Sequence, residues 1–283
     1  MAASFNNQLN VLNQNLEVKS TLKFDSFFEE IPESILAFEF AETLNRNAFL
    51  CANHFGDFAF AELNASCTQF KKPKWESSNS PVSTMSLNPL ENLVFAAGDH
   101  EGYLKIWSLV DEKLTLKSEK KEVHQGQVLR CLWASSNEIF SLGFDDTFKV
   151  SDVNSLTNTY FMYFKDSMAL TMDYSSSKRV LLTGHINGAI RMFDDQTRNK
   201  TTQKVFKSHS SFISSVKWNP TNEHVFISAD GSGKIKVWDI RADFPVYTIE
   251  GSKDDKIYDL AWIGEKHFCS GDANGLLVKH AFV

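Results

Sequence analysis

The sequence predicts an all-β protein made of one repeated sheet, and two observations lead to that prediction. The first is the stretch His209–Arg241, in which three short β-rich runs are separated by turn signals and the last run ends on Trp238-Asp239. The second is that most of the chain can be laid over this stretch at a nearly constant spacing. A single sheet of this kind cannot bury both of its faces, so the copies are expected to stack.

Two independent series of positions give the spacing of the repeat. Positions equivalent to Trp238 are separated by 44, 42, 45 and 42 residues, and positions at the end of the first strand by 41, 44 and 44 residues. A period of about 40–45 residues with a Trp-Asp ending is typical of the WD repeat, the four-stranded blade of a β-propeller. The first series is Trp107, Ser151, Phe193, Trp238 and His280, and the second is Trp133, Tyr174, Trp218 and Trp262.

The elements follow in chain order from this register. Residues 1–15 are Asn/Gln-rich and are predicted to be a flexible N-terminus, and Leu16–Phe24 alternates as a strand. Six blades are visible, or seven if residues 1–34 hold a degenerate copy. The last copy ends without an outer strand, so we expect Leu16–Phe24 to pair with it and close the ring of a single propeller over residues 16–283. The six visible blades start near residues 35, 82, 124, 168, 209 and 257.

Composition argues against several classes of protein. A net charge of −6 gives no support for a protein that wraps nucleic acid through its phosphates. No apolar run of roughly 18 residues predicts a membrane span, and the start of the chain lacks the basic and apolar parts of a secretory signal. The cysteines lie far apart, which favours reduced, buried thiols over a zinc site or a disulfide frame. They are Cys51, Cys67, Cys131 and Cys269.

Two blades carry the polar residues that commonly stabilise a WD blade through hydrogen bonds. Such a set holds a His before the first strand, a Ser on the second strand, an Asp in the following hairpin and the Trp. It could pass for a Ser-His-Asp catalytic set, but the spacing recurs with the fold, which favours a structural role. The third copy has His124, Ser141 and Asp145, with Ser151 at the Trp position. The fifth copy has His209, Ser228 and Trp238, with Ser232 at the Asp position, which in other copies holds Glu101, Asn187 and Asn274.

No other motif indicates catalysis, a cofactor or a metal. Gly231-Ser232-Gly233-Lys234 lacks the first glycine and the following helix of a phosphate loop. Lys71-Lys72-Pro73-Lys74 is either a short nuclear import signal or a solvated loop. The sequence therefore predicts a protein that is not an enzyme and that has no cofactor. The remaining histidines show no spacing of paired metal ligands and are expected at solvent or turn positions: His54, His100, His185, His224, His267 and His280.

One face of the blades is the predicted surface for partner proteins. In each blade, the residue before the first strand and the residue before the hairpin Asp position are expected to point to the same face. Phe144, Ile186 and Phe212 are apolar at such positions, which is typical of an interaction hot spot unless each is folded into its own loop. The predicted partner-binding residues are Gln127, Phe144, Ile186, Phe212, Lys256 and Ala273.

Several stretches from about Val123 onward have a more specific pattern than a generic WD repeat. They include CLWASSNEIFSLGFDDTFKVSD, SHSSFISSVKWNPTNEHVFIS, KVWDIRADFPVYTI and DDKIYDLAW followed by CSGDANGLLV. The most specific features are Pro245-Val246-Tyr247 after the Trp-Asp-Ile-Arg run and Asp255-Lys256-Ile257 before Trp262. On these residues the chain resembles the eukaryotic ribosome-biogenesis family of WD-repeat protein twelve.

The resemblance implies a non-catalytic scaffold subunit of the three-protein complex with pescadillo and the block-of-proliferation WD protein (PeBoW). That complex works in the nucleus and nucleolus on maturation of the large (60S) ribosomal subunit and pre-rRNA processing, and the propeller docks on the propeller of its partner. Family members carry a ubiquitin-like domain before the propeller, whereas fewer than 35 residues precede the first visible blade here, so we expect that domain to be lacking. The alternative is a substrate receptor of a cullin ubiquitin ligase, because Trp238-Asp239-Ile240-Arg241 fits the short motif that docks its adaptor.

Overall fold

The computed structural model describes most of the chain in a series of ranges, and every regular element in them is a β-strand. The described part contains no helix that is long and apolar enough to cross a membrane. In each sheet the strands lie in chain order and pair antiparallel. The predicted all-β class is therefore confirmed. The ranges are residues 2–5, 8–13, 15–23, 35–43, 46–53, 55–63, 74–77, 80–91, 94–110, 113–195, 202–251 and 256–282.

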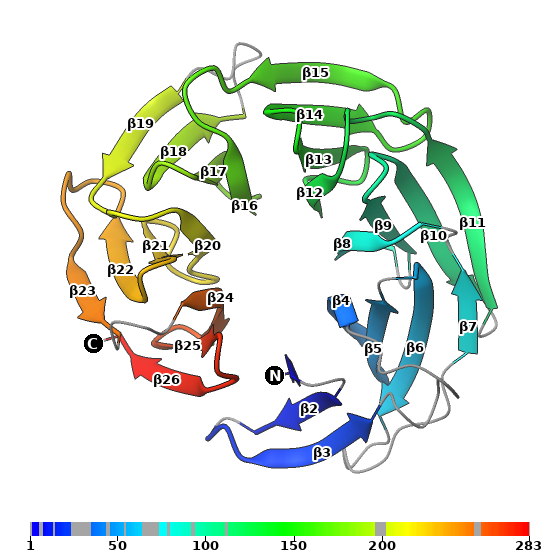
Figure 1. Cartoon of the computed structure of the whole chain (residues 1–283), viewed down its shortest axis with the longest axis horizontal. Helices are drawn as coiled ribbons and strands as arrows, with labels where there is room; N and C mark the ends of the chain where they lie inside the picture. The colour runs from blue at the N-terminus through cyan, green and yellow to red at the C-terminus, as the bar shows by residue number, and fades with distance from the viewer. Residues whose placement is uncertain are drawn as a thin grey trace. The chain divides into compact units, whose positions relative to one another are not determined.

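The chain divides into two compact units, Met1–Tyr163 and Phe164–Val283. In the first unit four sheets follow one another, and the last strand of each lies at the outer edge (Figure 1). Their strands are β1 (Ala2–Phe5), β2 (Gln8–Leu12) and β3 (Val18–Lys23); β4 (Ile35–Thr43), β5 (Arg46–Asn53), β6 (Asp57–Leu63) and β7 (Lys74–Ser77); β8 (Val82–Leu87), β9 (Val94–Asp99), β10 (Leu104–Val110) and β11 (Lys113–Lys120); β12 (Val128–Trp133), β13 (Glu138–Gly143), β14 (Thr147–Asp152) and β15 (Asn158–Tyr163).

The second unit holds three sheets of the same plan among its described residues. With the first unit this makes seven sheets in the described chain, the larger of the two counts that the repeat allowed. The strands are β16 (Ala169–Ser175), β17 (Val180–His185), β18 (Ala189–Asp194) and β19 (Thr202–Lys207); β20 (Ile213–Trp218), β21 (Val225–Asp230), β22 (Lys234–Asp239) and β23 (Tyr247–Glu250); β24 (Ile257–Ile263), β25 (His267–Asp272) and β26 (Leu277–Ala281).

The core of each unit lies between neighbouring sheets. The second strands β9, β17 and β21 are buried at all six positions, because each is covered on both of its faces. Between the sheets β4–β7 and β8–β11, the ring of Phe58 lies 5.4 Å from that of Phe95 and 5.1 Å from that of Trp107. Between the sheets β16–β19 and β20–β23, Phe206 meets Phe226 and Trp238 in the same way, at 5.1 and 5.3 Å.

In six of the seven sheets described, the hairpin between the second and third strands has the same backbone conformation. Three residues after the end of the second strand, the backbone adopts a left-handed conformation, which costs glycine least. Five of six hairpins have glycine there and one has aspartate. These residues are Gly56 (φ 89°), Gly102 (85°), Asp146 (58°), Gly188 (78°), Gly233 (86°) and Gly275 (78°).

The start of the chain differs from the prediction. Residues expected to be flexible form β1 and β2, and β3 pairs with β2 rather than with the last sheet, which has three strands in the part described. The local turn explains this pairing: Oδ1 of Asn13 accepts the backbone N–H groups of Asn15 and Glu17 at 2.8 and 2.9 Å. Closing this short loop costs less chain entropy than pairing with a strand at the far end of the sequence.

Some predicted features lie outside the described residues, namely His54, Cys67, Lys71-Lys72-Pro73 and Asp255. The other three cysteines, Cys51, Cys131 and Cys269, are buried, as the sequence predicted. Burial raises the pKa of the Cys51 thiol to about 12, so this thiol stays protonated and unreactive at neutral pH.

Candidate functional site

The sheet β20–β23 holds a continuous chain of buried hydrogen bonds. Trp238 Nε1–H donates to Ser228 Oγ at 2.8 Å, and Ser228 Oγ lies 2.7 Å from His209 Nε2. His209 Nδ1 in turn lies 2.8 Å from Oδ2 of Asp230. A carboxylate only accepts, so Nδ1 carries the proton and Nε2 accepts from the serine hydroxyl. Burial lowers the pKa of His209, in keeping with a neutral ring.

Asp230 is the acid of this set. The acid position predicted from the sequence was Ser232, so that assignment is corrected. Oδ1 of Asp230 accepts the backbone N–H groups of Ser232 and Lys234 at 2.9 and 3.1 Å, and Ser232 also donates its hydroxyl. Burial alone would raise the pKa of Asp230, but the hydrogen bonds from His209, Ser232 and Lys234 lower it to about 2. Asp230 therefore joins the hairpin backbone to the buried histidine.

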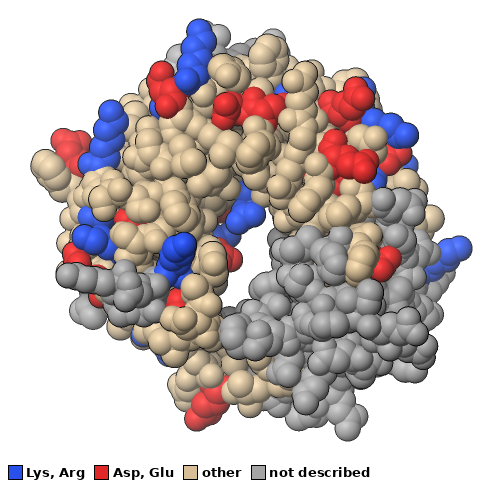
Figure 2. Space-filling view, in the orientation of Figure 1, with Lys and Arg blue, Asp and Glu red and all other residues tan. Residues whose placement is uncertain are grey.

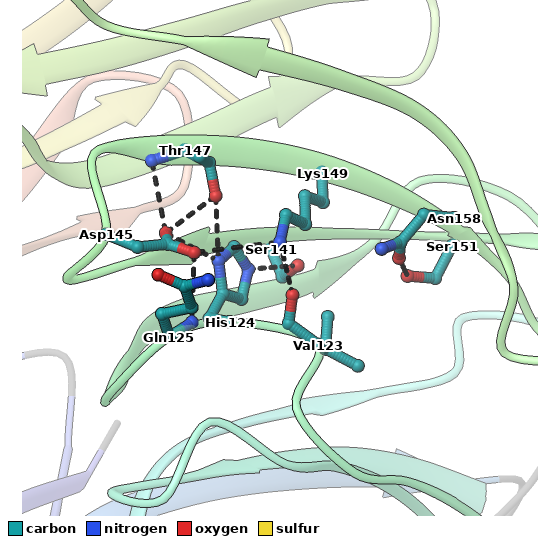
Figure 3. Close-up of polar contacts among 9 residues, drawn as sticks. All are labelled: Val123, His124, Gln125, Ser141, Asp145, Thr147, Lys149, Ser151 and Asn158. Carbon is teal, nitrogen blue, oxygen red and sulfur yellow. Dashed lines mark hydrogen bonds and ion pairs between the residues drawn. The ribbon is translucent and has the colours of Figure 1, made fainter.

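In the sheet β12–β15 the structure brings together His124, Ser141 and Asp145 (Figure 3). Ser141 Oγ lies 2.8 Å from His124 Nε2, while Oδ1 of Asp145 and the hydroxyl of Thr147 lie 2.9 and 3.0 Å from Nδ1. Burial opposes ionisation of Asp145, but hydrogen bonds from His124, Thr147 and the Gln125 backbone hold its pKa well below the usual range. Ser151, at the Trp position, bonds to Asn158 instead of to Ser141.

Gly143 explains why the two blades take their acid from different positions. Gly143 is the counterpart of Asp230, since each ends the second strand of its sheet. A Cβ atom at Gly143 would lie 2.1 Å from His124 Nδ1 and 2.6 Å from Oδ1 of Asp145. In the sheet β12–β15, Asp145, two residues after Gly143, thus fills the space that Asp230 fills in the sheet β20–β23.

The sheet β16–β19 has a histidine at the position that holds the acid in β20–β23. His185, expected at a solvent or turn position, is fully buried at the counterpart of Asp230. Its Nδ1 lies 2.8 Å from the carbonyl oxygen of Ser167, its Nε2 lies 2.8 Å from Oγ1 of Thr183, and the ring of Phe164 is 5.0 Å away. Burial lowers the pKa of His185 to about 4. A neutral histidine therefore takes the place of the acid in this blade.

Two further blades keep part of the set. In β24–β26 the ring of His280 stacks on Phe268 and its Nε2 lies 2.9 Å from Ser270 Oγ, so His280 stands where Trp238 stands in the preceding sheet. This corrects the expectation of a solvent or turn position. In β8–β11 the buried Lys105 pairs with the buried Asp99 at 3.1 Å. Of the remaining described histidines, His100 is exposed at a turn, His224 lies partly exposed at a turn, and His267 lies partly exposed at the start of β25.

The networks join residues within one blade, and their serines lie out of reach of solvent. The hydroxyl groups of Ser141 and Ser228 belong to fully buried residues, whereas a nucleophilic serine must be reached by its substrate. Across the described ranges no three His, Cys, Asp or Glu side chains gather as a metal site would require.

The predicted partner-binding residues fall on the ends of the same hairpins. In the sheets β12–β15, β16–β19, β20–β23 and β24–β26 the residue after the second strand donates its backbone N–H to the residue before the first strand. Phe144 and Ile186 are exposed by 60% and 52%, so their apolar side chains lie at the surface. The pairs are Gln127 with Phe144 at 2.9 Å, Met168 with Ile186 at 3.0 Å, Phe212 with Gly231 at 2.9 Å, and Lys256 with Ala273 at 2.9 Å.

Comparison with known proteins agrees with this geometry. A family model described as "WD domain, G-beta repeat" matches residues 200–239, the stretch that contains the whole His209–Trp238 network. Residues 200–239 therefore form a WD repeat.

Similar curated proteins share one description, "Ribosome biogenesis protein WDR12 homolog". The protein of Nematostella vectensis is 25% identical over 251 residues, which cover 79% of this chain and 59% of that protein. The protein of Drosophila erecta is 25% identical over 67% of this chain and 48% of its own length, and that of Ixodes scapularis 27% identical over 64% and 43%. The WD-repeat chain thus spans about half the length of the curated relatives it matches. The predicted resemblance to this family is confirmed.

The three apolar residues on the hairpin ends of this WD-repeat protein are not equivalent. A Cβ atom at Gly231 would lie 2.2 Å from the ring of Phe212, so that ring is folded against its own hairpin and is half-buried. Gln127 is also partly buried and approaches His100 at 3.3 Å, while Lys256 and Ala273 are exposed. Phe144, in the first unit, and Ile186, in the second, are therefore the apolar groups of this set that are most available to a partner.

Proposed function

We propose that this WD-repeat protein is a non-catalytic scaffold subunit in biogenesis of the large ribosomal subunit and in pre-rRNA processing, in the nucleus and nucleolus. The observation that carries the proposal is the similarity, over as much as 79% of the chain, to proteins described by their role in ribosome biogenesis. These relatives extend beyond the matched region, so the proposal concerns the propeller part alone.

The geometry supports binding of proteins rather than chemistry. Side chains bond to the backbone of the hairpins that follow Phe144 and Ile186: Thr147 N–H donates to Asp145 Oδ1 at 3.2 Å and Asn187 N–H to Ser167 Oγ at 3.3 Å. These bonds help to fix the position of the residues at the hairpin end. Exposed Phe144 and Ile186 sit at such ends, and rigid apolar side chains on a polar surround are typical of binding hot spots. We infer that these ends contact a second WD-repeat propeller protein and a pescadillo-like subunit within a pre-ribosomal particle, with no cofactor involved.

A role as a cullin substrate receptor has less support. The residues of its proposed motif, Trp238-Asp239-Ile240-Arg241, make contacts inside the blade. Trp238 is fully buried, and Arg241 donates hydrogen bonds from Nε and Nη2 to Asp239. The Arg241 guanidinium lowers the pKa of Asp239 to about 2, so this pair is charged and satisfied locally. The motif is explained by the structure of the blade.

Affinity purification of the tagged chain from its own cells tests the proposal. We expect co-recovery of a pescadillo-like protein, a second propeller protein and precursors of the large-subunit rRNA. Recovery of a cullin adaptor without any of these would contradict the proposal.

A single-residue variant tests the surface. Ile186→Asp places a charge on one of the two exposed apolar residues of the proposed contact and is expected to lower recovery of the partner by about tenfold or more. Phe244→Asp is the matched control, because Phe244 is exposed by 80% in the loop before β23, away from the hairpin ends. Equal effects of both variants would show that the hairpin ends are not the docking surface.

A further inference from the structure

The outer strand β15 differs in chemistry from the other outer strands of the protein. Its six residues, Asn158-Thr159-Tyr160-Phe161-Met162-Tyr163, include no charged side chain. The strand β11 has Lys113, Lys117, Glu119 and Lys120, β19 has Lys204 and Lys207, and the short β23 ends on Glu250. Even the four residues of β7, Lys74-Trp75-Glu76-Ser77, hold two charges.

The strand ladders allow a position-by-position comparison. Phe161 of β15 stands opposite Lys149 of β14, and Val205 of β19 stands opposite Arg191 of β18 in the same register. The equivalent residue of β11 is Glu119 and that of β23 is Thr248. Phe161 and Tyr163 are exposed by 67% and 53%, so two aromatic side chains project from one face of β15 beside an open strand edge.

An outer strand without a charged residue is unusual, because its unpaired backbone N–H and C=O groups can then pair with another strand. Natural sheets commonly protect their edges with lysine, proline or short strands, and the other outer strands of this chain do so with charge or shortness. Figure 1 shows β15 as the last strand of its sheet, with β14 on one side only. We propose that β15 pairs antiparallel with β15 of a second copy of this chain, joining two blades into one continuous sheet.

Charge and register favour a second copy as the occupant. Pairing about a two-fold axis at Phe161 sets Phe161 opposite its own copy and Tyr160 opposite Met162, and such cross-strand aromatic contacts are stabilising. No like charges meet along this edge, because the strand has none. The same pairing of β19 would bring Lys204 and Lys207 of both copies to a shared edge, where like charges repel.

The size of the contact sets the expected strength. A whole aromatic side chain buries about 150–250 Å². Because Phe161 and Tyr163 are exposed by 67% and 53%, the pairs from the two copies can bury roughly 360–600 Å² in total. This lies below the area of about 1,200 Å² that stable complexes bury, so the dimer is expected to form in the micromolar range rather than the nanomolar range.

Sedimentation velocity and light scattering over about 1–300 μM protein test the proposal. The unmodified chain is expected to change reversibly from monomer to dimer in this range. Phe161→Lys sets like charges opposite one another and is expected to weaken the dimer by about tenfold or more. Val205→Lys is the matched control, since it also adds a lysine opposite a cation on the neighbouring strand, and it should leave the dimer unchanged.

A mixing experiment separates pairing from misfolding. Phe161→Lys and Phe161→Glu should each be monomeric with a normal unfolding transition, and an equimolar mixture should recover a one-to-one heterodimer because opposite charges then meet at the two-fold axis. A chain that is monomeric at every concentration would overturn the proposal. So would a dimer that survives Phe161→Lys, or variants that do not recover pairing on mixing.

Discussion

His209 is a neutral histidine held between a hydroxyl donor and a carboxylate, and each polar atom of the set has one role. Trp238 donates to Ser228, Ser228 donates to His209, and His209 donates to Asp230. Inside a protein such a chain is worth more than its separate bonds, because each bond polarises the next. The cost of breaking it therefore depends on which group is removed.

We predict that Trp238→Phe lowers the free energy of unfolding by about 1–2 kcal/mol, because it removes one N–H donor and leaves an aromatic ring in place. His209→Ala should cost more, roughly 3–5 kcal/mol, since the buried Asp230 then loses its partner. Urea denaturation measures both. Trp107→Phe is the control: Nε1 of Trp107 has no hydrogen-bond partner within the part of the chain described, so this change should be close to neutral. Equal losses for the two Trp variants would contradict the role of the network.

Buried histidines also predict how stability depends on pH. The pKa of His185 is about 4 in the folded protein and 6.5 in the unfolded chain. Between these values the unfolded state binds a proton that the folded state does not, so stability falls as pH decreases from 6.5 to 4, by at most about 3 kcal/mol. His185→Asn should reduce this slope in unfolding experiments at pH 7, 6, 5 and 4. An unchanged slope would show that His185 does not titrate on unfolding.

At the scale of residues, the sequence located the histidines and serines of the two main sets but not every partner. Ser141 and Ser228 were found because both lie at the same position on the second strand of the repeat. Asp230 was missed because the acid was expected at the position equivalent to Asp145. The sheets β12–β15 and β20–β23 take the acid that bonds to their histidine from different positions. The useful signal was the left-handed residue three positions after the strand end, which makes Asp230 the counterpart of Gly143.

At the scale of elements, the hairpin is the unit that the repeat preserves. The residue that ends the second strand often accepts backbone N–H groups from the turn: Asn53 from Phe55 and Asp57, and Asp272 from Asn274 and Leu276. The glycine that follows also meets the next sheet. A Cβ atom at Gly188 would lie 2.6 Å from the carbonyl oxygen of His209.

This contact gives a prediction with an internal control. Gly188 and Gly264 both have positive φ angles of 78° and 70°, but a Cβ atom at Gly264 would meet nothing within 4 Å. Gly264→Ala should therefore cost only the backbone strain, about 1–2 kcal/mol. Gly188→Ala should cost that amount and a further clash with the next sheet, detectable as a clearly lower midpoint in thermal unfolding. Equal midpoints would mean that the two sheets move apart without cost.

The strands themselves could be predicted from alternation and turn signals, because most blade pairing is between consecutive segments. The chain start could not. Residues 1–15 are polar, and polarity predicted disorder, yet Asn13 closes a local turn that lets β2 pair with β3. Backbone pairing that depends on one turn residue does not require a hydrophobic pattern. The repeat pattern therefore did not predict the sheet β1–β3.

At the scale of the whole molecule, stability comes from each sheet contacting its neighbours in the unit. Side chains of one first strand accept backbone N–H groups from the next: Thr84 from Cys131 at 3.1 Å in the first unit, and Asp173 from Trp218 at 2.6 Å in the second. These bonds satisfy strand edges that would otherwise be open. The period of the repeat predicted such stacking, whereas the side chains that make the bonds vary between blades and could not be predicted.

Charge over the whole molecule leads to the last prediction, which concerns RNA. The net charge is −6, and Figure 2 shows acidic and basic side chains interspersed over the described part of the face in view. Binding to RNA without sequence preference depends on phosphate neutralisation by clustered Lys and Arg. We therefore expect the purified chain alone to bind a pre-rRNA fragment more weakly than about 10⁻⁴ M in filter binding at physiological salt.

A charge variant shows whether that weakness is electrostatic. Asp166, Glu223 and Asp243 have exposed carboxylates, and changing all three to Lys raises the net charge from −6 to zero. If phosphate repulsion keeps RNA away, this variant should show weak binding that is lost as salt rises from about 50 to 200 mM. Tight binding by the unmodified chain would contradict the prediction, since pre-rRNA in the affinity purification could then be held by the chain itself. Absence of such binding would mean that rRNA precursors reach this protein through the proteins it binds.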